Sequence, residues 1–250
     1  KPKLIENVDF VIFRELTGGI YFGAKSLSED GTIARDDCSY SVAEIERVAI
    51  LAFEYAQKRR KKLTLVDKAN VLETSRLWRK VVQQMAPKYS DVAVDYLFVD
   101  NAAMQIILNP GQFDVVLTEN LFGDIISDEA SVLAGSLGLL PSASVGSKVA
   151  LFEPIHGSYP QAKGLDIANP LGSILSAAML LDHFGLNKEA DVVRDAASWC
   201  LNNGFVTKDI DAANSYTTTA IGDIICEYVE RHATGKAQVH HERLHKSTII

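Results

Sequence analysis

The sequence predicts an α/β fold built around a largely parallel sheet. Short apolar runs alternate with segments that keep the 3.6-residue period of a helix. The connections between them are short, which is typical of chains in which helices link parallel strands. Hydrophobic residues make up 47 % and charged residues 23 % of the 250 residues, so the chain has a globular composition and can bury a core.

The first elements follow from local patterns. The apolar run 8–13 predicts a strand. Residues 14–23 hold two adjacent glycines followed by Ile, Tyr and Phe, which indicates a loop leading into a strand or hairpin arm. Residues 24–40 are polar and are expected to be irregular. A helix begins after Ser41, because Glu44 stands at the capping-box position and apolar residues follow at helical spacing.

The alternation continues through the middle of the chain. Strands are expected at 63–66, 92–99 and 113–118, and helices at 72–86, 101–108 and 121–134. Five consecutive basic residues, 58–62, end the first long helix. We interpret them as cations favoured at a helix C-terminus rather than as a nucleic-acid site.

The amino-acid composition changes after Gly135. Residues 135–147 are rich in Gly, Ser and Pro, which predicts a crossing between domains. A strand at 149–152 and a loop at 153–170 follow, then helices at about 171–183, 187–203 and 217–231. The tail 233–250 is expected to be weakly structured.

Composition excludes several classes of protein. A net charge of −7 argues against a chain built to hold nucleic acid, which needs clustered Lys and Arg. No run of about 18 apolar residues occurs, so no membrane span is expected. The three cysteines are far apart and form no CxxC pair, which favours a reducing compartment, the cytoplasm. The start has neither a signal-peptide pattern nor an initiator Met, and the chain is expected to begin within a domain.

Two aspartates form a candidate metal site. Asp124 and Asp128 are four residues apart on a predicted helix and therefore share one face. Asp100, just after a strand, is the candidate third ligand. Hard carboxylates of this kind suit Mg²⁺ or Mn²⁺. The alternative is solvated aspartates on an exposed face, since this spacing is common.

Three further side chains could take part in a reaction at such a metal site. Lys68 follows a buried strand, where active sites of α/β folds lie, and next to a cation it could act as a general base. Tyr21 could donate a proton to a carbanion-like carbon, and Arg14 could bind a carboxylate with two hydrogen bonds. The alternatives are a surface lysine, a packing or dimer-contact tyrosine, and a surface ion pair.

The loop after the last strand is a weaker signal. Its small residues permit close approach of a ligand, and His156 could stack on a nucleotide or have a structural role. No G-x-G-x-x-G motif is present. His240, His241 and His245 in the polar tail are interpreted as incidental. From the residues alone, the conclusion is an α/β enzyme with a candidate divalent-metal site.

Several long motifs, in one order, resemble the β-decarboxylating dehydrogenases, the family of the isocitrate and isopropylmalate dehydrogenases. They lie at 14–23, 66–72, 99–104, 120–128, 135–144, 153–161 and 167–170, and the resemblance spans about residues 1–231. The segment after Arg14 reads Glu-Leu-Thr-Gly-Gly-Ile-Tyr-Phe-Gly, which is similar to the isopropylmalate branch. Isocitrate, homoisocitrate and tartrate relatives typically have Arg-Glu-Asn-Thr-Glu there.

The resemblance implies an architecture. Residues 1–134 would form the metal, substrate and dimerisation domain, and 135–232 the returning part of a discontinuous nucleotide domain. Members of the family carry roughly a hundred residues more before the first motif. The resemblance also implies a homodimer with shared active sites, in which Lys68 and Asp100 cross the interface.

It also implies a reaction: oxidation of (2R,3S)-3-isopropylmalate by NAD⁺ and loss of its β-carboxylate, giving 4-methyl-2-oxopentanoate, in leucine biosynthesis. A metal held by Asp100, Asp124 and Asp128 would bind the substrate, and Lys68 would take the C2 hydroxyl proton. Tyr21 would protonate the enolate, while Arg14, with Asp100, would bind substrate. The alternatives are a related β-decarboxylating dehydrogenase or a non-catalytic dimerisation module.

The cofactor site would lie between residues 156 and 169, with His156, Gly157, Ser158, Gln161 and Asn169 as its contacts. Members that use NAD usually carry Asp at position 161, whereas this chain has Gln161, and Tyr159 stands where Ala is usual. Gln is neutral and repels a 2′-phosphate less than Asp would. NAD is the expected cofactor.

Overall fold

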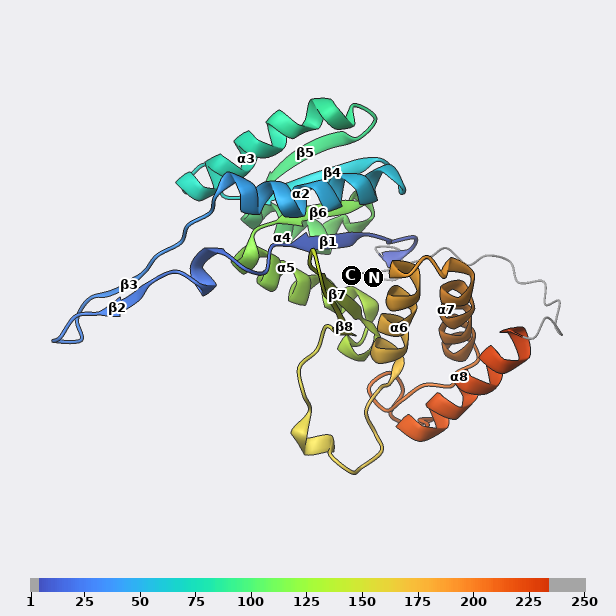
Figure 1. Cartoon of the computed structure of the whole chain (residues 1–250). Coiled ribbons are helices and arrows are strands. Elements are labelled where there is room, and N and C mark those ends of the chain that lie inside the picture. Colours follow the sequence, from blue (N-terminus) through green and yellow to red (C-terminus); the bar gives the residue numbers. More distant parts are fainter. Residues whose placement is uncertain (1–4, 234–250) are drawn as a thin grey trace. The chain divides into compact units, whose positions relative to one another are not determined.

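A computed structural model describes residues 5–233 of the chain. Their contacts divide them into two compact units, one ending at Leu133 and the other beginning at Ala134 (Figure 1). The assignment of metal, substrate and dimer contacts to the first unit, and of nucleotide binding to the second, remains a prediction. The tail with His240, His241 and His245 lies outside the described residues.

The first unit contains a four-stranded, fully parallel sheet with the order β1-β6-β4-β5. Its strands are β1 (Val11–Arg14), β4 (Lys62–Asp67), β5 (Ala93–Phe98) and β6 (Val115–Thr118). The central strands β4 and β6 are buried almost throughout, because helices cover both faces. The predicted α/β class with a parallel sheet is confirmed.

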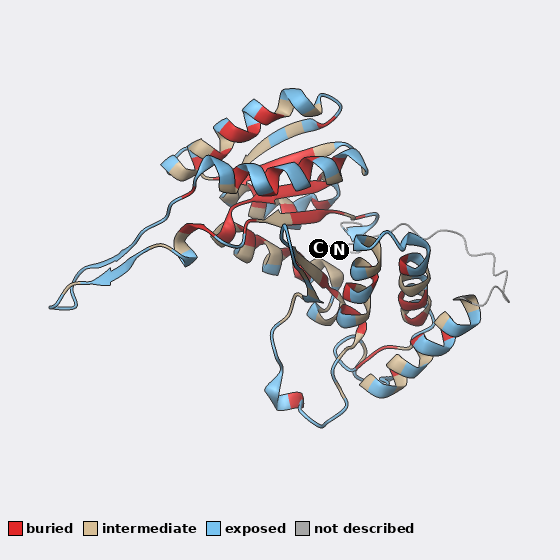
Figure 2. Cartoon of the chain, viewed as in Figure 1, coloured by how far each residue is buried: buried red, intermediate tan, exposed pale blue. Residues whose placement is uncertain are grey.

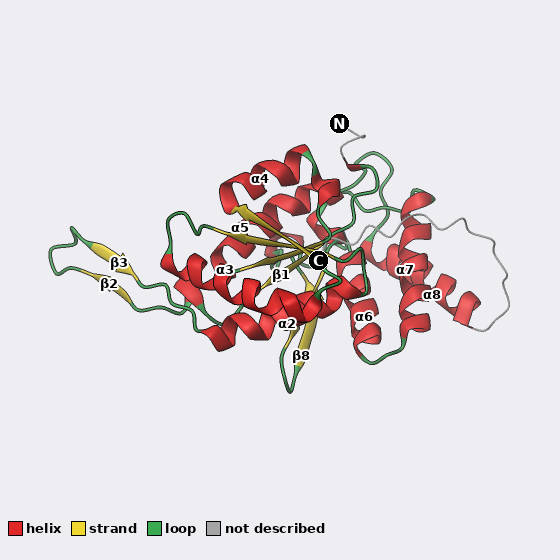
Figure 3. Cartoon of the chain, turned by 90° about the horizontal axis from the view of Figure 1, so that it is seen from above, coloured by secondary structure: helices red, strands yellow, loops and turns green. Residues whose placement is uncertain are grey.

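Four helices flank this sheet: α2 (Val42–Gln57), α3 (Glu73–Met85), α4 (Val99–Leu108) and α5 (Asn120–Ser131). Figures 1 and 3 show α2 and α3 on one face, and α4 and α5 on the other. The capping box of Ser41 and Glu44 is present at the start of α2. The buried core follows the sheet and the inner sides of the helices (Figure 2). Trp78, Phe53 and Leu65 are among its fully buried side chains.

The basic run after α2 is paired with carboxylates inside the unit. Arg59 contacts Asp9 and the buried Asp114, with 2.8 Å between the charged atoms in each pair. Lys62 pairs with Asp95. Arg59 thus joins the end of α2 to the residues that precede β1 and β6, and Lys62 joins β4 to β5, so this run stabilises the unit.

The segment 14–36 differs from the expectation. The turn that carries Tyr21 is a 3₁₀ helix (Gly19–Tyr21), not a strand. The hairpin comes later, as β2 (Lys25–Leu27) and β3 (Ala34–Asp36), in the stretch expected to be irregular. All six strand residues are exposed, and Figure 1 shows the hairpin extending away from the sheet of its own unit. A strand pair without a buried face has no apolar alternation, which explains why the sequence pattern missed it.

The second unit consists of a two-stranded antiparallel sheet and three helices. Its elements are β7 (Pro141–Val145), β8 (Ala150–Pro154), α6 (Leu171–His183), α7 (Asn187–Asn202) and α8 (Thr218–Ala233). The segment 135–147, predicted as a crossing between domains, contains the strand β7, which pairs with β8. Buried Leu171, Cys200 and Ile221 tie the three helices together. Among residues 5–233, no helix is both long and apolar enough to cross a membrane.

Candidate active site

The candidate residues of the first unit follow the carboxyl ends of its parallel strands. Arg14 ends β1, Lys68 follows β4, and Asp100 follows β5. Asp124 lies in the first turns of α5, which follows β6. Parallel strands place their carboxyl ends at one edge of a sheet, where open α/β folds bind ligands. The topology therefore brings residues from distant parts of the sequence to the same edge.

Arg14, Tyr21 and Asp124 form one cluster. The Arg14 guanidinium donates a 2.5 Å hydrogen bond to one Asp124 oxygen, and the Tyr21 hydroxyl donates a 2.7 Å hydrogen bond to the other. Arg14 also lies 5.6 Å from the centre of the Tyr21 ring. The hydrogen bond to Asp124 raises the pKa of Tyr21 above its usual value. A phenol held in its neutral form is a proton donor.

Lys68 and Asp100 form a second cluster. The Lys68 ammonium donates a 2.7 Å hydrogen bond to Asp100, and this bond lowers the pKa of the Asp100 carboxyl. Directly before Lys68, the buried Asp67 accepts two 2.8 Å hydrogen bonds from Arg79. Arg79 in turn lies against the Phe98 ring. The segment that carries Lys68 is thus anchored by a buried ion pair.

The three predicted metal ligands do not gather within one chain. Among residues 5–233, no group of three or more His, Cys, Asp or Glu side chains could hold a metal ion. Asp128 is exposed on α5, one turn after Asp124, while Asp100 pairs with Lys68. The described residues thus do not bring Asp100 together with Asp124 and Asp128. This ligand set remains a prediction.

The predicted cofactor residues lie in the second unit. Gly157, Ser158 and Gln161 are exposed, and the His156 ring lies 3.0 Å from the Gly157 carbonyl oxygen. An open hollow of about 520 Å³ is formed by the end of the same loop and the start of α8; its lining residues are Ala162, Gly164, Asp166, Ile167, Ala168, Thr218 and Thr219. The loop residues that line it adjoin the predicted cofactor residues in the sequence, but the lining includes none of those predicted residues.

Asn169 follows that hollow along the loop and is held by hydrogen bonds. Its amide nitrogen donates to Asp209 at 3.1 Å, and its oxygen accepts from the Leu171 backbone at 3.0 Å. Asp209 also accepts from Ser136 and Thr207. Asn169 is therefore oriented, with one amide hydrogen beyond those used by these bonds. Its proposed contact with the cofactor remains a prediction.

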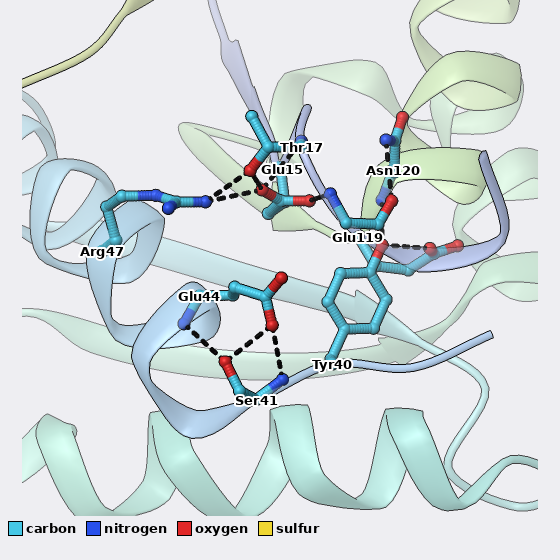
Figure 4. A network of polar contacts seen from close by, with 9 residues as sticks. Glu15, Thr17, Tyr40, Ser41, Glu44, Arg47, Glu119 and Asn120 are labelled. Atoms are coloured by element: carbon cyan, nitrogen blue, oxygen red, sulfur yellow. Dashed lines mark hydrogen bonds and ion pairs between the residues drawn. The ribbon is translucent and has the colours of Figure 1, made fainter. Parts of the chain in front are cut away.

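A buried polar network supports the Arg14 cluster, and the sequence analysis did not single it out (Figure 4). Glu15 is 1 % exposed and accepts hydrogen bonds from the backbone of Thr17 and Gly18 and from Arg47. The Tyr40 hydroxyl donates to Glu119 and accepts from the Asn120 backbone. Polar residues directly after apolar strands, such as Glu15 and Glu119, were the signal that could have indicated this network.

The chain is similar to known dehydrogenases in both sequence and structure. The family model described as isocitrate/isopropylmalate dehydrogenase matches residues 1–225. The 3-isopropylmalate dehydrogenase of Bacteroides fragilis (strain YCH46) is 52 % identical over 233 residues, which cover 92 % of this chain and 65 % of that protein. That of Wolinella succinogenes is 50 % identical over 235 residues, with the same coverage of both chains. The chain thus spans about two thirds of the length of these relatives.

Solved structures agree with the sequence comparison. An isocitrate dehydrogenase from Methylococcus capsulatus is similar with a TM-score of 0.84 and 38 % identity, over 87 % of this chain and 66 % of that one. A β-decarboxylating dehydrogenase from Thermococcus kodakarensis is similar with a TM-score of 0.77 and 37 % identity, over 88 % and 64 %. At these identities, the likeness supports common ancestry as well as a common fold.

Proposed function

The chain belongs to the isocitrate/isopropylmalate dehydrogenase family, and from this membership we propose that the protein oxidises and decarboxylates (2R,3S)-3-isopropylmalate to 4-methyl-2-oxopentanoate. The relatives at about 50 % identity bear the name 3-isopropylmalate dehydrogenase, which supports this substrate. The step would belong to leucine biosynthesis, in the cytoplasm.

The observation that carries the proposal is the convergence of Arg14 and Tyr21 on Asp124. One cluster holds a cation suited to a carboxylate, a neutral phenol and a carboxylate suited to a hard metal ion. These are the groups that binding and decarboxylating a hydroxydicarboxylate require. A cluster that served packing alone would not need this chemistry at the exposed edge of the sheet.

The residues present fit the expected cofactors. Asp124 is 42 % exposed and Asp128 is exposed, so both offer hard oxygen ligands for Mg²⁺ or Mn²⁺, with Asp100 of a second copy as the third. The hollow beside Ala162 and Gly164 has room for part of NAD. When bound, the nicotinamide supplies a hydride acceptor and the divalent ion supplies a Lewis acid for the charge left by CO₂.

The chain's own residues would then bind the substrate and move its protons. Arg14 would hold a substrate carboxylate through its planar fork. Lys68, reached from a second copy, would accept the proton of the C2 hydroxyl as general base. Tyr21 would donate its hydroxyl proton to the enolate carbon left after CO₂ departs. Asp124 would orient Tyr21, through the hydrogen bond present between them.

A homodimer would complete the site, and the first unit has surfaces that support it. On α4, Met104, Ile107 and Leu108 are each at least 55 % exposed, and Ile125 on the adjacent α5 is 55 % exposed. The hairpin of β2 and β3 is exposed on both strands. Neighbouring exposed apolar side chains, such as those on α4 and α5, mark interaction surfaces. Association through them would bring Lys68 and Asp100 of one copy toward Asp124 of the other.

The test is turnover by the full-length protein. NADH absorbance is followed with isopropylmalate and Mn²⁺, and compared with isocitrate, homoisocitrate and tartrate, and with NADP⁺ in place of NAD⁺. We expect isopropylmalate and NAD⁺ to give the highest kcat/KM. A higher kcat/KM with isocitrate or tartrate would reject the substrate, and no NADH with any of them would indicate a non-catalytic dimerisation module.

A further inference from the structure

The Arg14 side chain is enclosed by one face of α5. Asn120, Gly123 and Asp124 lie at positions i, i+3 and i+4 of this helix and therefore share a face. Asn120 accepts hydrogen bonds from Arg14, and Asp124 forms an ion pair with it. Gly123 leaves free the space that the Arg14 side chain occupies. We propose that Asn120 and Gly123 are positioning residues, which set the direction in which Arg14 meets a substrate carboxylate. This inference rests on the proposed function.

The Asn120 amide connects Arg14 with the turn that carries Tyr21. Its oxygen accepts hydrogen bonds from two Arg14 nitrogens, Nε at 3.1 Å and Nη2 at 2.8 Å. Its nitrogen donates to the Gly18 carbonyl at 3.1 Å. Asn120 is 2 % exposed, so water does not compete for these bonds. Only an amide offers an acceptor to Arg14 and a donor to Gly18 from one planar group.

Asn120 is itself held in place. Its backbone N–H donates a 3.0 Å hydrogen bond to the Tyr40 hydroxyl, which donates in turn to Glu119 (Figure 4). Glu119 accepts hydrogen bonds from the Leu121 and Phe122 backbones and caps α5. The orientation of the amide is thus set by the start of the helix and does not depend on a ligand.

Gly123 provides the space along which Arg14 lies. A Cβ atom at this position would come within 2.6 Å of Arg14 Cγ and 3.0 Å of its Cβ and Cδ. The contact falls in the middle of the arginine side chain, so its guanidinium would have to move. The glycine is in a helix interior, where alanine is intrinsically better by about 1 kcal/mol. Helix stability therefore does not explain a glycine at this position, whereas the space that Arg14 needs does explain it.

The arrangement leaves part of the guanidinium for a ligand. Asn120 and Asp124 together accept three of the five N–H groups of Arg14 in the described part of the chain. The remaining two N–H groups are on the terminal nitrogens, and Arg14 also interacts with the Tyr21 hydroxyl. A substrate carboxylate would bind these donors beside Tyr21. Loss of the Asn120 contact or of the free space beside Gly123 would turn this pair of donors away from the site.

Steady-state kinetics of the full-length protein test the proposal. In Asn120→Ala and Gly123→Ala, we expect the KM for isopropylmalate to rise about tenfold or more, with the KM for NAD⁺ within about twofold of the wild type. Asn120→Asp keeps the acceptor for Arg14 and should lie nearer the wild type than Asn120→Ala. An unchanged KM for isopropylmalate in Gly123→Ala would overturn the proposal.

Two controls separate positioning from folding. Gly222 lies in α8, and a Cβ there would meet nothing within 4 Å. Gly222→Ala therefore makes the same helix change without the clash and should leave both KM values unchanged. Asn202→Ala, at the exposed end of α7, is the matched control for the asparagine. Thermal unfolding is measured for each variant, so that a higher KM in a protein that is still folded at the assay temperature is assigned to Arg14 and not to loss of the fold.

A readout without turnover distinguishes this inference from the proposed function. The Arg14 Nε–H should exchange slowly with water in ¹⁵N NMR spectra, its signal being assigned by its absence in Arg14→Lys. Exchange should be faster in Asn120→Ala and Gly123→Ala, and unchanged in Gly222→Ala. If the wild type lacks turnover but shows this pattern, the proposed function fails and the positioning of Arg14 stands. Equal exchange in all variants would reject the positioning itself.

Discussion

The ammonium nitrogen of Lys68 lies 2.7 Å from a carboxylate oxygen of Asp100, across the ends of neighbouring strands β4 and β5. The two side chains are 24 % and 65 % exposed. Ion pairs at exposed positions contribute little to stability, because solvent screens the charges. Substitution of either residue should therefore change the chemistry of the protein far more than its fold.

Shared sites predict complementation between inactive variants. Lys68→Met and Tyr21→Phe should each lower kcat by about 10²–10⁴, the usual contribution of a general acid or base. In an equal mixture refolded together, half of the dimers are mixed, and each holds one intact site. We expect about a quarter of wild-type activity to return. If the mixture stays inactive although mass spectrometry detects mixed dimers, Lys68 and Tyr21 belong to one chain's site.

Metal binding should depend on Asp124. Mn²⁺ at 100 times its Kd should stabilise the folded protein by about 2.7 kcal/mol, and EDTA should reverse this. Asp124→Asn removes one charged ligand and should weaken Mn²⁺ binding by about 100-fold, measured by calorimetry. The control is Asp223→Asn, on the exposed side of α8. Equal affinities in both variants would exclude Asp124 as a ligand.

The ion pair behind Lys68 should be important for stability. Arg79→Met leaves the carboxylate of Asp67, which is 1 % exposed, without its charged partner. We expect a loss of about 3–5 kcal/mol in urea unfolding. The double variant Asp67→Asn/Arg79→Met removes the orphaned charge and should recover part of this loss. A loss below about 0.5 kcal/mol in Arg79→Met would show that Asp67 is satisfied without it.

The capping box at α2 predicts a pH-dependent stability. Hydrogen bonds from the Ser41 side chain and backbone lower the pKa of Glu44. A lowered carboxyl pKa stabilises the fold above the unfolded value of about 4.3, and this contribution is lost as the pH falls through the folded value. Ser41→Ala should cost about 1 kcal/mol at pH 7.

Urea unfolding of wild type and Ser41→Ala at several pH values measures this difference directly. The difference between the two proteins should shrink as the pH falls below about 4, because protonated Glu44 no longer accepts both bonds. Val42→Ala, an exposed change one residue further on, controls for general effects at the start of the helix. A difference that stayed constant with pH would contradict the role of Glu44.

Cys200 should be protected from thiol reagents. It lies on α7 and is buried in the core of the second unit. Burial raises the pKa of its thiol to about 11. Cys38 and Cys226 are exposed. In the native protein, an aromatic disulfide reagent at pH 8 should modify Cys200 only after denaturant is added, as peptide mass spectrometry would show. Rapid labelling of Cys200 in the native state would mean that the second unit opens readily.

The same raised pKa predicts a loss of stability in alkali. The unfolded chain releases the Cys200 proton first, so the free energy of unfolding should fall as the pH rises from about 9 towards 11. Cys200→Ala lacks this titration, and its stability relative to the wild type should increase over that range. An unchanged difference between the two proteins would show that the thiol remains unperturbed in the fold.

Local patterns predicted most of the regular elements. The helix over 42–57 was predicted from its cap and apolar period, and the strands at β4, β5 and β6 from their apolar runs. The hairpin of β2 and β3 was missed because its residues are exposed on both faces. β7 was missed because its sequence, Pro-Ser-Ala-Ser-Val, is rich in residues that are typical of loops. Sequence patterns detect apolar alternation, which the β2–β3 hairpin lacks, and they mistake a strand of loop-type composition for a loop.

The amino-acid order by itself determined which chemical groups are present, and its motifs determined the family to which they belong. Tertiary structure alone decided which groups meet: parallel pairing of β1 with β6 brings Arg14 to Asn120 and Asp124, more than 100 positions further along the chain. Parallel pairing of β4 with β5 likewise brings Lys68 to Asp100. The reason is physical. The apolar patterns that predict a helix or a strand extend over a few neighbouring residues. The order of strands in a sheet depends instead on how helices and strands far apart in the sequence bury their apolar faces against one another.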